Sequence, residues 1–121
     1  MFKIRVETKF NASHQLIFSD GKKEPLHEHQ WKLWVDVKNE KLDDIGLVMD
    51  FHLLEEIIKK AVAEMNNVSL NEIEYFQENN PSAENVAKYV FERVEPQLPN
   101  DVTLASVRAF EQPNFSAKFA K

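Results

Sequence analysis

The chain has 121 residues, 43% of them hydrophobic and 29% charged, which is typical of one soluble globular domain spanning residues 1–121. It contains no cysteine and only two glycines, which excludes disulfides, thiolate metal ligands, a cysteine nucleophile and a glycine-rich phosphate loop. A net charge of −5 without a cluster of basic residues argues against a nucleic-acid partner, and the short apolar runs argue against a membrane partner or span.

The first part of the chain reads as two strands. Residues 2–10 alternate apolar and charged side chains, which predicts a half-buried strand. The same alternation is unlike the continuous apolar segment of a secretory signal, so we expect a cytoplasmic protein. A polar loop at residues 19–25, with an Asp-Gly turn and a proline, leads to a second alternating strand that runs to Val37.

Two helices are expected in the middle of the chain. Asp50 can cap a first helix, in which apolar residues recur with helical spacing as far as Met65. Asn80-Pro81, a cap followed by a first-turn proline, predicts the start of a second helix, which Pro96 ends.

Two more strands are expected near residues 101–111 and 114–120, joined by a turn. The order strand, strand, helix, helix, strand, strand predicts an α+β fold. In this fold a four-stranded antiparallel sheet (β-β-α-α-β-β) carries both helices on one face. Such a sheet has two free edges, which a homo-oligomer could pair.

The histidines give the sharpest chemical signal. His27 and His29 share one face of the second strand, and His14 has the parity of the apolar face of the first strand if that strand continues beyond residue 10. If the strands pair, three imidazoles converge, as in a catalytic zinc site with an open fourth position. The alternative is a pair of polar residues at a strand entrance. We expect His52 to be a surface residue of the first helix.

Five segments resemble the 6-pyruvoyltetrahydropterin synthase and 6-carboxytetrahydropterin synthase family, in the family's order and spacing. They are FNASHQL (10–16), LHEHQWKLWV (26–35), GLVMDFHLLEE (46–56), LNEIEYFQENNPSAENVA (70–87) and VRAFEQPNFSAKF (107–119). The resemblance covers nearly the whole chain. It implies the T-fold, whose element order agrees with the one expected above, and a homohexamer with active sites between subunits.

The resemblance also implies the roles of individual residues. His14, His27 and His29 would hold zinc, and Glu111 would bind the ring of a small-molecule pterin through two parallel N–H donors. Ser82 and Glu84 match a segment that lines the pterin pocket. The alternatives are a capping role for Ser82, a solvated first-turn position for Glu84, and no function for Glu111.

The chain departs from the family at the proton relay. Lys23 stands where the family has its cysteine, and Asn66 and Asn67 stand where it has an Asp-His pair. Asparagine does not accept a proton near neutral pH. Some family members use a glutamate in place of the cysteine and cleave the dihydroneopterin side chain in an aldolase-like reaction. Glu24 is one residue from that position, and Lys23 is a second candidate base.

We therefore expect a zinc-dependent pterin enzyme, a lyase acting on the side chain of a dihydroneopterin derivative, with a non-standard base. The base could be Glu24, a zinc-bound hydroxide or the substrate's own phosphate. One alternative is a catalytically inactive paralogue that binds a pterin or purine-like ligand in the retained pocket. Another is a structural oligomer whose zinc only stabilises the fold.

Overall fold

The computed structural model describes residues 1–121 and contains five strands and three α-helices. In chain order the elements are β1 (Phe2–His14), β2 (His27–Asn39), α1 (Phe51–Val62), β3 (Val68–Ser69), α2 (Glu74–Glu78), α3 (Ala83–Val94), β4 (Thr103–Gln112) and β5 (Phe115–Phe119). Short 3-10 turns lie at Ala63–Met65, Leu70–Glu72 and Glu95–Gln97. The predicted order of four strands and two helices is confirmed. The elements β3 and α2 were not predicted, because such short segments carry no periodic pattern.

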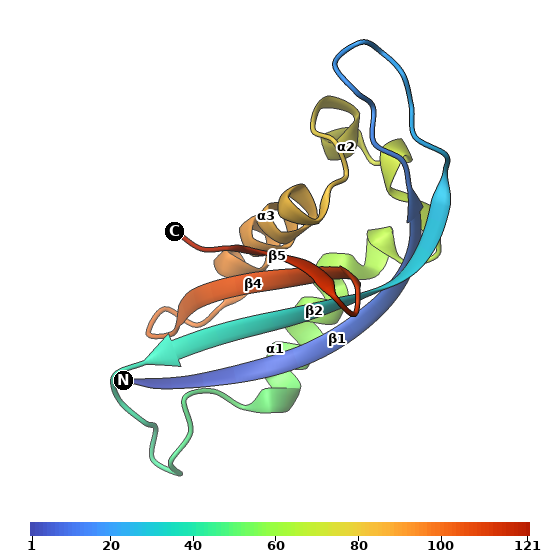
Figure 1. Ribbon diagram of the computed structural model, residues 1–121. Coiled ribbons are helices and arrows are strands. Elements are labelled where there is room, and N and C mark those ends of the chain that lie inside the picture. The colour runs from blue at the N-terminus through green and yellow to red at the C-terminus, as the bar shows by residue number, and fades with distance from the viewer.

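The strands form one sheet in the order β3-β1-β2-β4-β5. The four longer strands pair antiparallel, as predicted, and β3 adds a short parallel pairing to β1 at Ala12 and Ser13. The strands β1 and β2 extend well beyond β4 and β5 and curve at their far end (Figure 1). That far end of the β1–β2 ribbon carries the three histidines.

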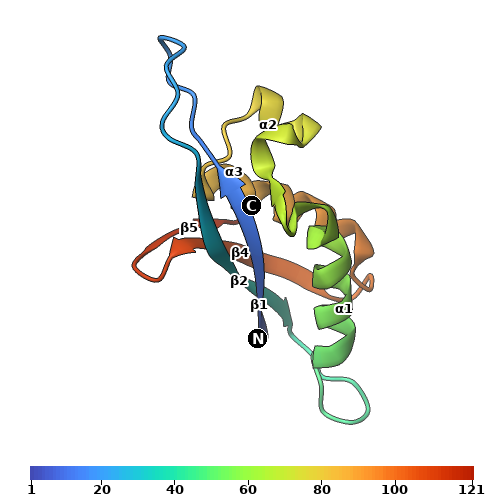
Figure 2. The same cartoon turned by 90° about the vertical axis from the view of Figure 1, so that its right-hand side faces the viewer.

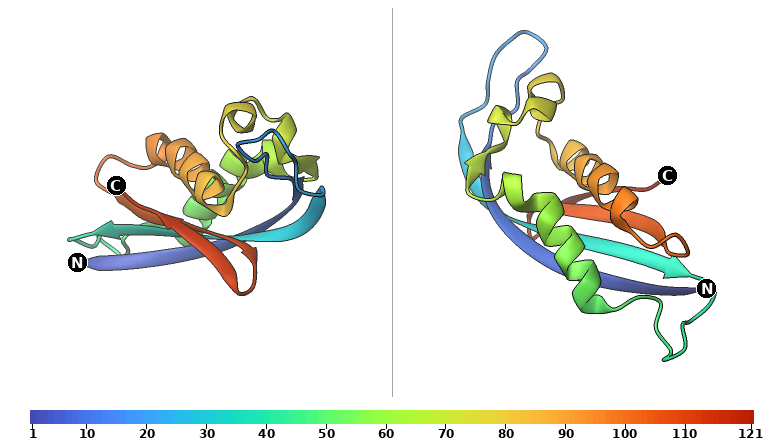
Figure 3. Two further views of the ribbon diagram at one scale, coloured as in Figure 1. Left: turned by 45° about the horizontal axis from the view of Figure 1, so that its top comes forward. Right: turned by 180° about the vertical axis from the view of Figure 1, so that it is seen from behind.

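The helices α1 and α3 cover one face of the sheet (Figures 2 and 3). The core lies between these layers because the inward positions of the strands and the apolar stripes of both helices are buried together. Its largest fully buried side chains include Trp31, Leu33, Leu54, Ile58, Val90 and Phe91. No helix of the fold is long and apolar enough to cross a membrane.

The start of α1 is as predicted, whereas the start of α3 is not. Asp50 caps α1 by accepting the backbone N–H of His52 at 2.8 Å. The second long helix was expected to begin at Asn80-Pro81 but begins at Ala83, with Ser82 as its cap. Asn80 is not the cap because its side-chain amide makes two hydrogen bonds to the backbone of Ile17, at 2.8 and 2.9 Å.

The hairpin between β1 and β2 projects beyond the helical layer (Figures 1 and 2). Its first segment is held by two asparagines of the α2 region. Asn71 bonds both backbone groups of Gln15, at 2.8 and 3.0 Å, and Asn80 bonds both backbone groups of Ile17. These side chains take the place of a partner strand, so the chain stays ordered where the sheet pairing of β1 to β3 ends.

Tyr89 of α3 provides a pH-dependent contribution to stability. Burial, together with the hydrogen bond that its hydroxyl donates to the Glu64 carboxylate, raises the pKa of Tyr89 to about 12. A tyrosine titrates near pH 10 in an unfolded chain. The folded state therefore holds this proton more tightly, and the stabilisation is complete below about pH 10 and is lost as pH rises through about 12.

We expect the free energy of unfolding to fall more steeply between pH 10 and 12 in the wild type than in a Tyr89→Phe variant, which lacks this proton. Urea denaturation at several pH values measures the difference. Tyr75, whose pKa burial also raises, is present in both proteins, so its effect cancels in the comparison. Parallel stability curves for the two proteins would contradict the prediction.

Candidate metal centre

Strand pairing brings the three histidines together. In the β1–β2 register His14 lies directly opposite His27, and Ala12 lies opposite His29. The ring centroids of the three imidazoles are 4.5, 4.6 and 5.5 Å apart. All three residues are on the inward face of the sheet, as the parity of the sequence predicted, and the His14 ring packs edge-on against Trp31.

Backbone carbonyls fix the orientation of two of the rings. The Nδ1–H of His14 donates to the Pro81 carbonyl at 2.7 Å, and the Nδ1–H of His27 donates to the Pro25 carbonyl at 3.0 Å. A carbonyl oxygen only accepts, so each Nδ1 carries the proton and each neutral ring presents its Nε2 lone pair to the centre. This second contact is the usual support of a metal-binding histidine.

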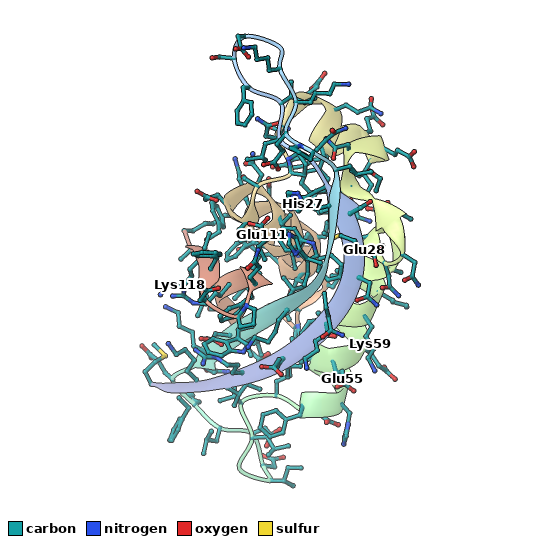
Figure 4. All side chains as sticks on the ribbon, turned by 45° about the vertical axis from the view of Figure 1, so that its right-hand side comes forward. His27, Glu28, Glu55, Lys59, Glu111 and Lys118 are labelled. Atoms are coloured by element: carbon teal, nitrogen blue, oxygen red, sulfur yellow. The ribbon has the colours of Figure 1, made fainter.

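Glu111 of β4 completes the cluster. Its Oε1 lies 2.8 Å from Nε2 of His14 and 3.4 Å from Nε2 of both His27 and His29. One ligand atom from each of the four residues lies within 4.8 Å of every other. Figure 4 shows Glu111 and His27 on the same side of β2, with Glu28 on the other side.

These contacts fit a cation. With Nδ1 of His14 bound to a carbonyl, its Nε2 lone pair faces a carboxylate oxygen at 2.8 Å, and two acceptors repel unless a proton or a cation lies between them. Nε2 of His29 is buried and has no hydrogen-bond partner, which is costly for a polar atom that bonds nothing. Three imidazoles and a carboxylate are a donor set that suits zinc and other divalent transition metals.

The electrostatics favour the neutral form of His29. Burial is the main cause that lowers the pKa of His29 below its usual value, and the neighbouring imidazoles of His27 and His14 add to the shift, whereas the carboxylates of Glu111 and Glu24 oppose it. A neutral imidazole is the form that binds a metal. Below the cluster, Trp31 is fully buried, with its ring centroid 5.0 Å from that of His14, and it closes the inner side of the centre.

Glu24 reaches the cluster from the hairpin. Its Oε1 lies 3.9 Å from Nε2 of His27 and accepts the backbone N–H of Leu16 at 2.9 Å. The backbone N–H of Glu24 in turn donates to the Leu16 carbonyl at 3.0 Å, so the residue is fixed at both ends. The neighbouring Lys23 is exposed. Of the two bases considered from the sequence, Glu24 is the one that an observed contact joins to the histidines.

Of the two candidate residues at the start of α3, only Ser82 has a structural contact within the chain. Ser82 caps α3, its Oγ accepting the backbone N–H of Asn85 at 3.1 Å, and Glu84 is exposed in the first turn. Pro81 is the residue of this segment that contacts the cluster, through its carbonyl oxygen. A role for Ser82 and Glu84 in pterin binding stays a prediction. His52 is exposed on α1, as expected.

Asn66 and Asn67, at the positions of the family relay, support β1. The Asn66 side chain accepts the backbone N–H of Asn11 at 3.0 Å, and the backbone N–H of Asn67 donates to the Asn11 carbonyl at 2.6 Å. Asn67 has a φ of 62°, a left-handed conformation that asparagine tolerates better than most residues. Both residues hold the strand that carries His14.

Comparison with known proteins identifies the family. Residues 3–121 match the sequence profile described as 6-pyruvoyl tetrahydropterin synthase. The chain belongs to the 6-pyruvoyl tetrahydropterin synthase family. It is similar to the 6-carboxy-5,6,7,8-tetrahydropterin synthase of Rickettsia conorii, with 29% identity over 133 residues covering 94% of this chain and 96% of the relative.

Two further similarities extend over nearly the whole chain. The dihydroneopterin monophosphate aldolase of Pyrococcus furiosus is 32% identical over 116 residues, covering 96% of this chain and 95% of the relative. The structure of Caenorhabditis elegans 6-pyruvoyl tetrahydropterin synthase superposes with a TM-score of 0.89 at 20% identity, covering 99% of this chain and 95% of that one. The α+β T-fold expected from the sequence is confirmed.

Sequence reasoning did not foresee how close Glu111 lies to the histidines. The register pairs Lys32 with Phe110, which brings Glu111 beside Trp31 and the histidine end of β2. Parity on β4 places Glu111 on the same face as Ala109, but the strand register needed to align it with β2 is not visible in the sequence. The carbonyls of Pro25 and Pro81 were missed as well, because backbone groups leave no signal in residue type.

Proposed function

We propose that this member of the family is a zinc-dependent lyase that cleaves the side chain of a dihydroneopterin derivative, with Glu24 as its catalytic base. The family implies a pterin substrate. The observation that carries the proposal is the position of Glu24, a carboxylate anchored by Leu16 with its Oε1 3.9 Å from Nε2 of His27. It gives the cluster a proton acceptor that Asn66 and Asn67 do not.

Three imidazoles would hold the metal in this proposal, those of His14, His27 and His29. The chemistry that a divalent cation supplies here is Lewis-acid polarisation of the substrate's side-chain oxygens. In this proposal Glu111 is not a metal ligand: its carboxylate would bind the amino-pyrimidinone edge of the pterin, since one carboxylate can accept two parallel N–H donors. Because Glu111 lies beside the histidines, a ring held by it has its side chain next to the metal ligands.

Glu24 would move the proton. In a retro-aldol cleavage the base takes the proton of the side-chain hydroxyl adjacent to the bond that breaks, and that oxygen becomes the carbonyl of the departing aldehyde. The electron pair of the broken carbon–carbon bond passes into the conjugated C=N of the dihydropterin ring. The carbon left on the ring then takes back a proton, which Glu24 is placed to return.

The similarity to the aldolase supports this reaction over synthase chemistry. The alignment to the aldolase is 116 residues long, whereas the alignment to the Rickettsia conorii synthase is 133 residues long and so exceeds the 121 residues of this chain. The synthase therefore has residues that this chain lacks. The absence of any cysteine also argues against the family's cysteine-based mechanism. A homohexamer, implied by the resemblance, is part of the proposal.

A specific observation favours a second candidate function. Asn66 and Asn67 are exposed and engaged with the backbone of Asn11, so the family relay has become part of the scaffold while Glu111 is retained. A pterin-binding protein without catalytic activity would show the same pattern. The two functions differ in whether the bound pterin is turned over.

A product assay separates them. Zinc-loaded protein is incubated with dihydroneopterin, its monophosphate and its triphosphate, and the pterins are separated by fluorescence-detected chromatography. The proposal expects a zinc-dependent pterin product shortened by carbon–carbon cleavage, together with an aldehyde. No product, combined with tight pterin binding that a Glu111→Gln variant loses while it keeps its zinc, would establish the inactive binding protein.

A further inference from the structure

The face of the sheet opposite the helices carries a positive charge that the composition of the chain conceals. The chain as a whole has a net charge of −5. The outward positions of the strands hold seven cationic residues and three carboxylates, a net charge of +4. They are Lys3, Arg5, Lys9, Lys32, Lys38, Arg108 and Lys118 with Glu7, Glu28 and Asp36. We call this surface the open face.

Cations lie directly opposite one another across neighbouring strands of the open face. The register pairs Lys3 with Lys38 and Lys9 with Lys32 between β1 and β2, and it pairs Arg108 with Lys118 between β4 and β5. Like charges at directly opposite positions destabilise a sheet. The open face has three such unfavourable pairs, and locally unfavourable arrangements of this kind are expected at functional sites.

Only some of these cations have a carboxylate partner. Arg5 binds Asp36 through two hydrogen bonds of 2.8 and 3.1 Å, so that carboxylate is already neutralised where Lys3 approaches it at 3.9 Å. Arg108 donates only to the Ser116 hydroxyl, at 2.8 Å, and Lys118 forms no ion pair. The chain therefore does not fully neutralise the positive charges of Lys3, Arg108 and Lys118.

These three cations line one concavity. It has a volume of about 250 Å³, and its lining also includes Arg5, Asp36 and Trp34. The wall at Trp34 is held in place, since the Arg5 guanidinium lies 4.0 Å from the centre of the indole and the indole N–H donates to Glu7 at 2.8 Å. The cations thus surround a hollow with a fixed wall.

We propose that this concavity binds a small oligophosphate anion through Lys3, Arg108 and Lys118. An anion with several charges would neutralise the facing pair Arg108 and Lys118, and the guanidinium geometry suits phosphate oxygens. A hollow of this size accepts phosphate groups and not a nucleic-acid helix.

The site is independent of the metal centre, because the histidines and Glu111 lie on the inward face of the same sheet. The test uses metal-free protein at pH 8 and inorganic triphosphate as the probe. Calorimetric titration at low salt should show saturable binding of one triphosphate per chain, weakening as salt is added. Lys118→Gln and Arg108→Gln should each weaken the binding about tenfold.

The matched control is Lys59→Gln. Lys59 is an exposed lysine of α1, paired with Glu55 at 3.5 Å and well apart from Lys118 (Figure 4). It should leave the affinity for triphosphate unchanged. Equal weakening in all three variants, or no saturable binding at low salt, would mean that the open face attracts anions only through its general charge and would overturn the site.

Two further measurements test the phosphate site. Without triphosphate, Lys118→Gln should raise Tm at low salt, because it removes a like charge facing Arg108; a lowered Tm would contradict the repulsion on which the proposal rests. A nucleoside triphosphate should bind with an affinity similar to that of inorganic triphosphate, because the phosphate groups are what is recognised. Much tighter binding of the nucleotide would overturn the assignment to phosphate alone.

Discussion

A Glu24→Gln variant is expected to lower kcat for cleavage of the pterin side chain by a factor of about 10² to 10⁴, the range that a positioned general base contributes. The glutamine has the same shape, and its amide oxygen can still accept the Leu16 N–H that holds Glu24 at 2.9 Å. The amide does not take up a proton near neutral pH. The variant should therefore keep its fold, its metal and its substrate affinity, and lose only the chemical step.

Glu28→Gln is the matched control for this experiment. Glu28 lies on β2 between His27 and His29, so the substitution makes the same change of charge next to the same ligands, but its side chain is exposed on the other side of the strand (Figure 4). Product formation followed by fluorescence-detected chromatography should be nearly unchanged in this variant. Equal kcat values for the wild type and Glu24→Gln would remove Glu24 from the mechanism and leave a zinc-bound hydroxide and the substrate's own phosphate as the candidate bases.

Much of the candidate site was predictable because strand parity is a strict rule. A period of two places His27 and His29 on the face of Trp31, and the same rule places His14 on the inward face of β1. The length of β1 was underestimated, since the residues that end it, Asn11-Ala12-Ser13-His14, lack the large apolar side chains that mark the alternation in residues 2–10, although the burial alternation continues through them. The strand continues there because Asn66, Asn67 and β3 bond its edge.

What the sequence did not reveal depends on contacts between distant segments. The start of α3 was predicted wrongly because the Asn80 side chain forms two hydrogen bonds with the backbone of Ile17, 63 residues away, and so does not cap the helix. The position of Glu111 against the histidines depends on the register of β4 with β2, which no local pattern encodes. The positive charge of the open face was not predicted for a similar reason: its cations come from four strands and do not form a basic cluster in the sequence.

The second large effect is expected at the metal ligands. A His29→Ala variant should lose zinc affinity by more than the 10- to 100-fold that removal of a supporting contact usually costs, because His29 presents its Nε2 directly to the centre. In the wild type, zinc at a hundredfold excess over its Kd should stabilise the fold by about 2.7 kcal/mol. The variant should show little of this gain. Calorimetric zinc titration and the Tm with and without zinc measure both effects.

The metal-free proteins distinguish a ligand from a structural residue. Nε2 of His29 forms no hydrogen bond within the chain, so its removal breaks none. The Tm of His29→Ala should therefore be close to that of the wild type when both proteins are free of zinc, and well below it when both are loaded with zinc. His52→Ala, which removes an exposed histidine of α1, should change neither zinc affinity nor the zinc-dependent rise in Tm. A His29→Ala protein that binds zinc as tightly as the wild type would show that the three imidazoles are not the metal site. The proton acceptor at Glu24 would then stand beside an ordinary cluster of polar residues, and the lyase mechanism would lose its Lewis acid.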